Sequence, residues 1–350
     1  MSKIKAIVYG LGGINKVAAR YMLEKGVDIV GVIDINPGLV GRDLGDVIGL
    51  GRAVGVTVSN DAEAVLLRQA DIAVVSVFSQ MDRMYELLES CIRHGLNVIT
   101  PAEEALYPWG VSPELAARLD RLSRAHGVTI SGGGAQDSFR VNIVSLLTGA
   151  SHRIESVLVR QLGNLGRLGA ESLKNYHVGE SAETFRAMVA QGVPLFSLQI
   201  CLAALIADLG LRIKGSDTSV EPIIAEADTP VGVLPGGRID KGRVVGMHKT
   251  IRIRTDQSID FNGEQISRIS NLEADAPTSV SECIITGSPR LHLRIEATDA
   301  EANSSAAASI VNRIPDVINS EPGFITVEKL PKLKYRALPL DRYLGDKQTG

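Results

Sequence analysis

The feature that most constrains the fold lies near the start of the chain, where an apolar run enters a glycine cluster. Residues 4–9 are rich in β-forming apolar residues, and the apolar positions of residues 17–23 recur at helical spacing. Between them stand Gly10, Gly12 and Gly13. The pattern predicts a strand, a tight turn and a helix, the arrangement in which a glycine lets the backbone approach a pyrophosphate at a helix N-terminus.

The residues around this turn strengthen the dinucleotide interpretation and also depart from its usual pattern. A second strand, residues 27–33, ends in Asp34, which lies 24 residues after Gly10, where an acidic residue meets a ribose hydroxyl. Asn15 occupies the third glycine position of G-x-G-x-x-G and should loosen the contact between helix and strand. An ordinary strand-to-helix turn with a solvated aspartate is the alternative. The predicted cofactor residues here are Gly10, Leu11, Gly12, Gly13, Ile14, Asn15 and Asp34.

The loop after Asp34 gives conflicting signals about the cofactor. Asp34 favours a free 2′-hydroxyl, whereas Asn36 and Arg42 are able to hold a 2′-phosphate. Arg42 is equally well explained as a solvated loop arginine. The sequence therefore predicts NAD(P)H and leaves NADH against NADPH open.

Strands and helices continue to alternate as far as residue 130. Because this alternation is typical of a doubly wound parallel sheet, ligands should bind at the carboxyl ends of its strands. The expected strands are 54–58, 71–77, 97–100 and 128–130, and the expected helices are 61–69, capped by Asn60, 82–94 and 113–126. At the strand ends, Ser76, Val77, Phe78, Thr100 and Pro101 are further predicted cofactor residues.

Two adjacent carboxylates follow the strand at residues 97–100. Glu103 and Glu104 stand close to Tyr107 and to Trp109, the chain's one tryptophan. Glutamates often occupy a helix N-terminus, where the helix dipole stabilises them. The expected helix begins later, at Pro113, so capping explains them poorly. We therefore predict a catalytic role for one of the two.

The second half of the chain changes character. Three glycines, residues 132–134, either let the backbone pass close to a ligand or form a hinge. Strand-like runs separated by turns then suggest an α+β domain with a mostly antiparallel sheet. The expected strands of this domain are 153–160, 219–225, 243–254 and 290–296, and helices are expected at 140–147, 181–191 and 198–209. Near the end of the chain, we expect a helix at 302–312, which stops before Pro315, and a last short strand at 323–327.

This change divides the chain into a dinucleotide-binding domain, residues 1–138, and a substrate and dimerisation domain, residues 139–299, with residues 300–340 packing back on the first. The open face of the second sheet should be buried in a homodimer, because a solvated face would leave a large apolar patch. Helices covering that face are the alternative.

Composition excludes several classes of function. A net charge of −3 gives no bulk attraction to nucleic acid or membrane, and no apolar run reaches the roughly 20 residues of a membrane span. The three cysteines form no C-x-x-C pair and the six histidines no H-E-x-x-H motif, so we predict no disulfide framework and no metal. Together with an N-terminus that opens directly into a strand, these features predict a cytoplasmic protein.

Several segments resemble one known family along nearly the whole chain. The chain is similar to the 2,4-diaminopentanoate dehydrogenases and the native NAD(P)H-dependent amine dehydrogenases, within the dihydrodipicolinate-reductase-like group. The resemblance implies oxidative deamination of an amine, or reductive amination with ammonia, with a small amine or carbonyl compound as substrate. The matching segments are 9–12, 30–34, 40–45, 103–109, 312–315 and 322–323, and the departures are Gln136-Asp137-Ser138-Phe139 and residues 196–200.

The resemblance also suggests roles for residues. Such a reaction needs a carboxylate that attracts ammonium and stabilises an iminium, and comparison with homoserine dehydrogenases favours Glu103 over Glu104. Tyr107, Trp109, Phe139, Tyr176 and His177 are the expected substrate pocket, although His177 is also well explained as an ordinary loop histidine. An alcohol dehydrogenase, an imine reductase and a non-catalytic nucleotide sensor remain alternatives.

Overall fold

The computed structural model describes residues 3–166, 168–174, 176–192, 197–234, 236–269 and 279–345. The chain forms two compact units. Unit 1 comprises Met1–Ile143, Ala203–Asp208 and Glu301–Gly350, and unit 2 comprises Val144–Leu202 and Leu209–Ala300.

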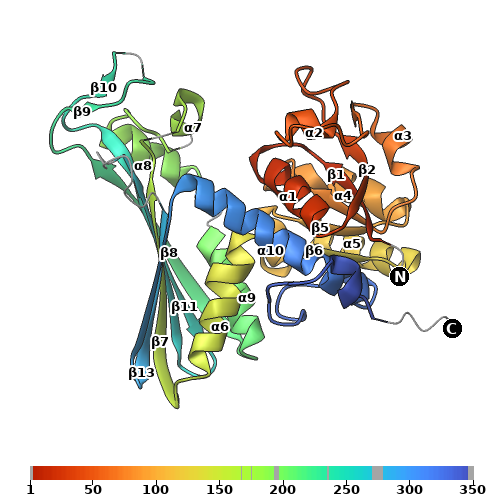
Figure 1. Ribbon diagram of the computed structural model, residues 1–350. Helices are drawn as coiled ribbons and strands as arrows, with labels where there is room; N and C mark the ends of the chain where they lie inside the picture. Colours follow the sequence, from red (N-terminus) through yellow and green to blue (C-terminus); the bar gives the residue numbers. More distant parts are fainter. Residues whose placement is uncertain are drawn as a thin grey trace. The chain divides into compact units, whose positions relative to one another are not determined.

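Unit 1 is built on a seven-stranded sheet in the order β15-β6-β5-β4-β1-β2-β3 (Figure 1). Every neighbouring pair is parallel, so all seven strands end at the same edge. This confirms the predicted doubly wound sheet. The strands are β1 (Lys5–Tyr9), β2 (Asp28–Ile33), β3 (Val58–Ser59), β4 (Ile72–Val75), β5 (Asn97–Thr100), β6 (Thr129–Gly132) and β15 (Gly323–Phe324).

Helices cover both faces of this sheet because its central strands are apolar on both sides. In β1, Ala6 and Val8 enter one core cluster together with α1 and α10, whereas Ile7 enters a second cluster with α4 and α5. The helices of unit 1 are α1 (Gly13–Glu24), α2 (Leu44–Val47), α3 (Ala62–Leu66), α4 (Met81–Arg93), α5 (Pro113–His126) and α10 (Asp299–Asn319).

The prediction that the last helix stops before Pro315 was wrong, because α10 continues to Asn319. A proline inside a helix removes one backbone hydrogen bond and costs about 3 kcal/mol. Around it, Val311, Ile314 and Val317 are all buried in the core of unit 1. Burial of several large apolar side chains at roughly 2 kcal/mol each outweighs that cost.

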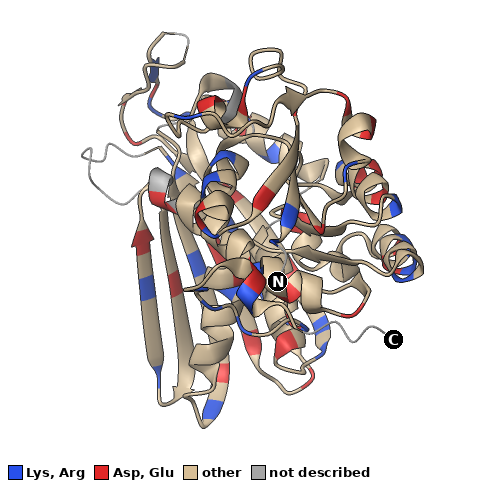
Figure 2. Ribbon diagram, turned by 45° about the vertical axis from the view of Figure 1, so that its right-hand side comes forward, with Lys and Arg blue, Asp and Glu red and all other residues tan. Residues whose placement is uncertain are grey.

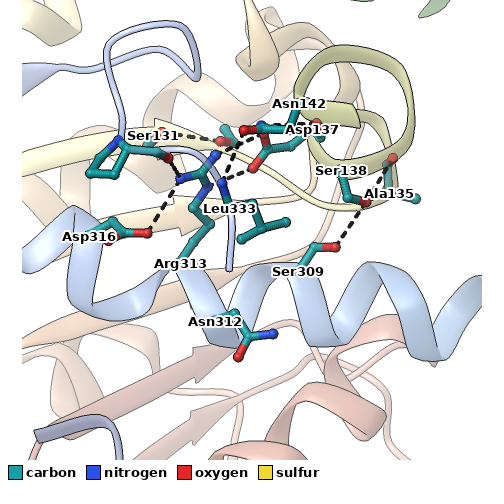
Figure 3. A network of polar contacts seen from close by, with 12 residues as sticks. Ser131, Ala135, Asp137, Ser138, Asn142, Ser309, Asn312, Arg313, Asp316 and Leu333 are labelled. Atoms are coloured by element: carbon teal, nitrogen blue, oxygen red, sulfur yellow. Dashed lines mark hydrogen bonds and ion pairs between the residues drawn. The ribbon is translucent and has the colours of Figure 1, made fainter. Parts of the chain in front are cut away.

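A buried network of ion pairs centred on Arg313 joins three segments of unit 1 (Figure 3). The guanidinium, which is 0% exposed, donates Nε to Asp137 Oδ2 at 2.7 Å and Nη2 to Asp137 Oδ1 at 3.0 Å. It also donates to the Pro331 carbonyl and pairs with Asp316 at 3.4 Å. Asp137 opens a π-helical turn, η3 (Asp137–Asn142), so the predicted helix at 140–147 begins earlier, and only its second part is the α-helix α6 (Ile143–Thr148).

Unit 2 contains a six-stranded mixed sheet in the order β14-β13-β7-β12-β11-β8. All neighbouring pairs are antiparallel except β12 with β7, which confirms the predicted mostly antiparallel sheet. The sequence prediction missed β12 and β13. The strands are β7 (Arg153–Asn164), β8 (Ile213–Ile224), β11 (Val244–Thr255), β12 (Asp260–Arg268), β13 (Ser279–Ser288) and β14 (Leu291–Ala297), and β9 (Thr229–Pro230) with β10 (Arg238–Ile239) forms a separate hairpin. The helices beside them are α7 (Ala170–Lys174), α8 (Ala182–Ala190) and the first half of α9 (Ser197–Asp208), whose residues from Ala203 onward belong to unit 1.

The two faces of this sheet differ in chemistry. One face is apolar and packs against α9, since a Cβ at Gly263 would lie 3.2 Å from Leu202 Cδ1. The other face carries side chains of both charges. Blue and red bands in Figure 2 mark the basic and acidic residues along the strands. There Arg160 pairs with Glu264 at 2.6 Å and with Glu282 at 3.1 Å. The expectation that the open face is a large apolar patch was therefore wrong, because the helix covers the apolar side.

Two local predictions in unit 1 need correction. The N-cap of α3 is Asp61, whose carboxylate accepts from Ala64 N at 3.0 Å, and not Asn60. The strand predicted at 54–58 is reduced to Val58–Ser59. Among the described helices, none combines the length and the apolar composition that crossing a bilayer requires.

Candidate cofactor and catalytic site

A cavity of about 480 Å³ opens at the carboxyl ends of β1, β2 and β4. Six of the predicted cofactor residues line it: Gly10, Gly12, Asp34, Ser76, Val77 and Phe78. The other predicted residues lie outside its lining: Leu11, Gly13, Ile14, Asn15, Asn36, Arg42, Thr100 and Pro101. Ligands of doubly wound sheets bind at this edge, so the cavity is the candidate nucleotide site.

The glycines of the first turn shape the cavity in two ways. Gly10 has φ +80°, and a Cβ there would lie 2.4 Å from the Ser76 carbonyl oxygen, so only glycine fits. At Gly12 and Gly13 a Cβ would meet nothing within 4 Å. The space in front of the α1 N-terminus is therefore open, and its backbone N–H groups are able to bind a pyrophosphate. The residues present fit a dinucleotide.

Asp34 is fixed by two backbone groups. Its Oδ2 accepts from Leu11 N at 2.6 Å and its Oδ1 from Asn36 N at 2.8 Å. The carboxylate thus keeps one orientation at the cavity wall and has lone pairs left for a ribose hydroxyl. Asn36 uses its own Oδ1 to accept from Gly38 N at 2.9 Å, and Arg42 is exposed.

Asn15 does the opposite of what we expected from its replacement of glycine. The side chain is 0% exposed, and its Nδ2 lies within hydrogen-bonding distance of three backbone carbonyls, those of Tyr9 at 3.3 Å, Gly10 at 2.8 Å and Val74 at 3.1 Å. These bonds tie α1 to β1 and β4. A glycine at this position would bring helix and strand together by close packing. The asparagine holds them together with hydrogen bonds instead.

Sequence reasoning missed an apolar side chain of the cavity wall. Ile35 is 84% exposed, although isoleucine is usually buried. It follows Asp34 directly, and an isoleucine at that point of a turn-rich loop was the available signal. A flat apolar ligand group, such as an adenine ring, would cover it.

The adjacent carboxylates Glu103 and Glu104 have different environments. They open a short 3₁₀ helix, η1 (Glu103–Leu106), so the expectation that no helix begins there was wrong. Glu104 Oε2 accepts from Met81 N at 2.7 Å, which caps the first turn of α4. The half-buried carboxylate of Glu103 has no hydrogen-bond or ion-pair partner among the described residues. Glu104 therefore has a structural role, and Glu103 is available for chemistry.

The turn that carries Glu103 is held against β6 by a glycine. A Cβ at Gly132 would lie 2.4 Å from the backbone carbonyl of Ala105 in η1. The first glycine of the 132–134 cluster thus serves the close approach of two backbone segments. Thr100, at the end of β5, is fully buried, and its hydroxyl accepts from Ala102 N at 3.1 Å.

Three of the predicted substrate residues belong to unit 1. Tyr107 precedes a second 3₁₀ turn, η2 (Pro108–Gly110), and Trp109 lies within it; both are half-buried. The Trp109 ring lies 6.2 Å from that of Phe324 in β15. Phe139 is half-buried in η3, the turn that the Arg313–Asp137 ion pair anchors.

The other two predicted substrate residues belong to unit 2. His177 has φ +55°, unusual for a residue with a side chain, and its ring lies edge-on to Phe185 at 5.6 Å. Tyr176 precedes it and is half-buried. Of the segment 196–200, in which the sequence departs from the family pattern, Phe196 lies outside the described residues.

Two known families match this chain, one near its N-terminus and one over its C-terminal part. The 2,4-diaminopentanoate dehydrogenase C-terminal domain matches residues 140–338, more than half of the chain. This protein belongs to the 2,4-diaminopentanoate dehydrogenase family. The N-terminus of dihydrodipicolinate reductase matches residues 4–104 of this family member. The resemblance inferred from the sequence is thereby confirmed.

Individual relatives of this family member match nearly its full length. It is 27% identical to 2,4-diaminopentanoate dehydrogenase of Acetoanaerobium sticklandii over 95% of its own length and 94% of the relative's. It is 23% identical to an amine dehydrogenase of Streptomyces virginiae, with 94% and 96% covered. The solved amine dehydrogenase of Mycobacterium smegmatis is 39% identical, with a TM-score of 0.84. The match covers 96% of this chain and 98% of the solved one.

Proposed function

We propose that this protein is an NAD(P)-dependent amine dehydrogenase. It would interconvert an amine and the corresponding ketone or aldehyde, by oxidative deamination or by reductive amination with ammonia. The observation that carries the proposal is the Glu103 carboxylate at the ligand-binding edge of the sheet. It has no partner within the described part of the chain, whereas its neighbour Glu104 caps α4. Family membership supports it, since relatives along the full chain are named amine and diaminopentanoate dehydrogenases.

The cofactor we propose is NADH. When bound, the reduced nicotinamide supplies the hydride that reduces the C=N carbon. Asp34 places a fixed negative charge at the cavity wall, where it accepts from a ribose hydroxyl and repels a 2′-phosphate. The exposed Arg42 does not line the cavity.

Glu103 would serve the amine side of the reaction. An ionised carboxylate attracts ammonium to the site and stabilises the positive charge of an iminium when water is excluded. It also exchanges protons with the nitrogen. These needs arise in amine chemistry, whereas oxidation of an alcohol requires neither ammonium nor an iminium.

The decisive test is oxidation of NADH or NADPH by the purified protein with a panel of small ketones and aldehydes, with and without ammonium. We expect oxidation that depends on ammonium. Full turnover without ammonium would instead identify an alcohol dehydrogenase or imine reductase. Tight nucleotide binding with no turnover would favour a sensor.

Glu103→Gln and Glu104→Gln form a matched pair for the same assay. Glu103→Gln should lower kcat on the order of 100-fold with little change in melting temperature, because none of the residues that the structure describes pairs with the carboxylate it removes. Glu104→Gln should keep most of the activity and lose about 1 kcal/mol of stability, because it weakens the cap of α4. Equal turnover of both variants and the wild type would contradict the role of Glu103.

The homodimer belongs to the proposal as well. Charged side chains, paired within one chain, lie on the open face of the six-stranded sheet. A dimer formed there would join two polar, charged surfaces, and its stability should depend on salt. Light scattering at low and high salt measures the mass and its salt dependence.

A further inference from the structure

The order of the strands places the parts of a dinucleotide along the candidate nucleotide cavity. In the order β4-β1-β2-β3, the open space at the α1 N-terminus follows β1, and Asp34 follows β2. A pyrophosphate in that space and a ribose held by Asp34 define a direction along the edge of the sheet. The base attached to that ribose should therefore lie toward the end of β3.

Asn60 follows β3 directly and lines the cavity. Ile33 at the end of β2 is the register partner of Ser59 in β3, and Asp34 N donates to Ser59 O at 3.0 Å. Asn60 and Asp34 are thus the next residues of two neighbouring parallel strands. An adenosine whose ribose is bound by Asp34 has its base within reach of Asn60.

The fold makes no use of the Asn60 amide. The cap of α3 comes from the next residue, Asp61, whose carboxylate accepts from Ala64 N at 3.0 Å. The Asn60 side chain is exposed and has no hydrogen-bond partner within the part of the chain that the structure describes. Its oxygen accepts and its NH₂ group donates in one plane. The amide is therefore available to a ligand.

Apolar side chains make up much of the remaining cavity wall. Ile35 is 84% exposed and Val77 is 40% exposed, and both line the cavity together with Phe78 and Leu87. Large apolar side chains exposed around one cavity indicate a site for an apolar surface. A flat ring that covers them loses water from its polar edge as well, so that edge needs a partner.

The other polar side chains of the lining stand farther along the sheet. Among the described lining residues these are Tyr9, which ends β1, and Ser76, which follows β4. Strand β1 lies two positions from β3 and β4 lies three. At about 4.8 Å for each strand, their backbones stand roughly 10 and 14 Å from the end of β3. Neither residue therefore stands where the base should lie.

We propose that Asn60 selects the base of the cofactor by binding the amino edge of adenine. This inference rests on the cofactor of the proposed function. Asn60 Oδ1 accepts from the 6-amino group, and Nδ2 donates to a ring nitrogen beside it, while Ile35 contacts the face of the ring. A purine that lacks the 6-amino group leaves the Asn60 oxygen without a donor and binds more weakly.

The test measures dissociation constants by calorimetry and needs no turnover. The probes are NADH and an analogue in which hydrogen replaces the 6-amino group of adenine. The wild type should bind NADH roughly 3- to 10-fold more tightly than the analogue. Asn60→Ala should bind NADH about 10-fold more weakly than the wild type does, and it should bind the two probes alike. Asn60→Asp keeps an accepting oxygen, so its preference for NADH should remain.

Asp61→Ala is the matched control at the neighbouring position, which is outside the cavity lining. It removes the cap of α3, so it should lower the melting temperature and leave the preference for NADH unchanged. Asn60→Ala should do the opposite and keep the wild-type melting temperature. This pattern separates a contact of the amide with the ligand from an effect on the start of α3.

Three results would overturn the inference. Equal binding of both probes by the wild type would show that the amino group is not recognised. A wild-type preference in Asn60→Ala would assign the recognition to another residue. In both cases the proposed function stands. Failure of the wild type to bind NADH or NADPH would remove the proposed cofactor together with the inference. If ammonium-dependent turnover is absent but the preference depends on Asn60, the amine dehydrogenase proposal fails and the inference stands.

Discussion

At the scale of single residues, neighbours in sequence have separate tasks. Glu104 accepts from the backbone of α4, whereas Glu103 beside it has no partner among the described residues. Asp34 is fixed by two backbone N–H groups, and Asn36, which follows two residues later, stabilises its own turn. A residue type at a motif position is therefore informative only together with what its side chain contacts.

Asp34 should decide between the two nicotinamide cofactors. Asp34→Ser removes a charge from the cavity wall, so under the proposed function the ratio of kcat/KM for NADH to that for NADPH should fall on the order of 10-fold or more. Arg42→Ala is the control, because Arg42 lies outside the cavity lining and its loss should leave the ratio unchanged. A fall in NADPH use in Arg42→Ala would instead show that Arg42 holds a 2′-phosphate.

At the scale of elements, segments distant in sequence are joined by buried polar contacts. Arg313 in α10 pairs with Asp137 in η3 and contacts the Pro331 carbonyl of the C-terminal segment. This pairing gives a physical reason for Asp137 in a segment that departs from the family pattern. Phe139 lies in the same turn, η3. The residues that differ from the family pattern therefore anchor this turn through the ion pair of Asp137 with Arg313.

Removal of Arg313 should be strongly destabilising. Arg313→Met leaves Asp137 and Asp316 buried beside an apolar side chain, which should cost about 3 to 5 kcal/mol in the free energy of unfolding. Arg212→Met is the matched control, because Arg212 is 87% exposed in its pair with Asp256 and should contribute less than about 1 kcal/mol. Urea unfolding measures both, and equal losses would contradict the role of the buried network.

The loop between β2 and β3 should be sensitive to acid. Hydrogen bonds from the backbone N–H groups of Val54, Gly45 and Gly55 hold the pKa of the Asp43 carboxyl below its usual range. The Asp43 carboxyl therefore binds a proton more tightly in the unfolded chain than in the folded one. Its contribution to the free energy of unfolding is complete above the unfolded pKa of about 4, and it is lost as the pH falls through the lower pKa of the folded protein. Asp43→Asn should therefore show a smaller drop in stability below about pH 4, measured by urea unfolding at each pH. An equally steep drop would contradict this.

These elements show which parts of the molecule the sequence could predict. The strand, turn and helix at residues 4–24, β5 and α5 were predicted because apolar spacing and Gly or Pro signals are local. The cap that Glu104 gives to α4, the ion pair of Asp137 with Arg313, and β15 beside β6 depend on contacts between distant segments, and no local pattern encodes them. The continuation of α10 through Pro315 shows core burial overriding a strong local signal.

At the scale of the whole molecule, the chain builds unit 1 from three separate stretches. Residues 1–143 supply six of its strands, and β15 and α10 complete the sheet and one of its two cores. The candidate nucleotide cavity is lined by residues of this unit alone. A nucleotide that binds there should therefore stabilise unit 1 against unfolding.

NADH should raise the melting temperature in a concentration-dependent way, by the equivalent of about 2.7 kcal/mol at 100 times its dissociation constant. Gly12→Ala is the sharpest control. The backbone at Gly12 has φ −78° and a Cβ would meet no protein atom within 4 Å, so this variant should fold as the wild type does. Its methyl group would occupy the space for the pyrophosphate, so NADH should no longer stabilise it. Wild-type stabilisation of Gly12→Ala by NADH would place the nucleotide elsewhere.

Because β15 lies at the edge of the parallel sheet beside β6, the ribosome makes β6 long before the strand that pairs with it. Gly323 pairs with Thr129, so the ribosome adds about 190 residues between the two strands. At ordinary elongation rates this takes roughly 10 to 40 seconds. Throughout that interval the outer N–H and C=O groups of β6 have no strand partner, and an unpaired sheet edge is a template for aggregation. The chain therefore completes six strands of this sheet well before it makes the strand that covers their open edge.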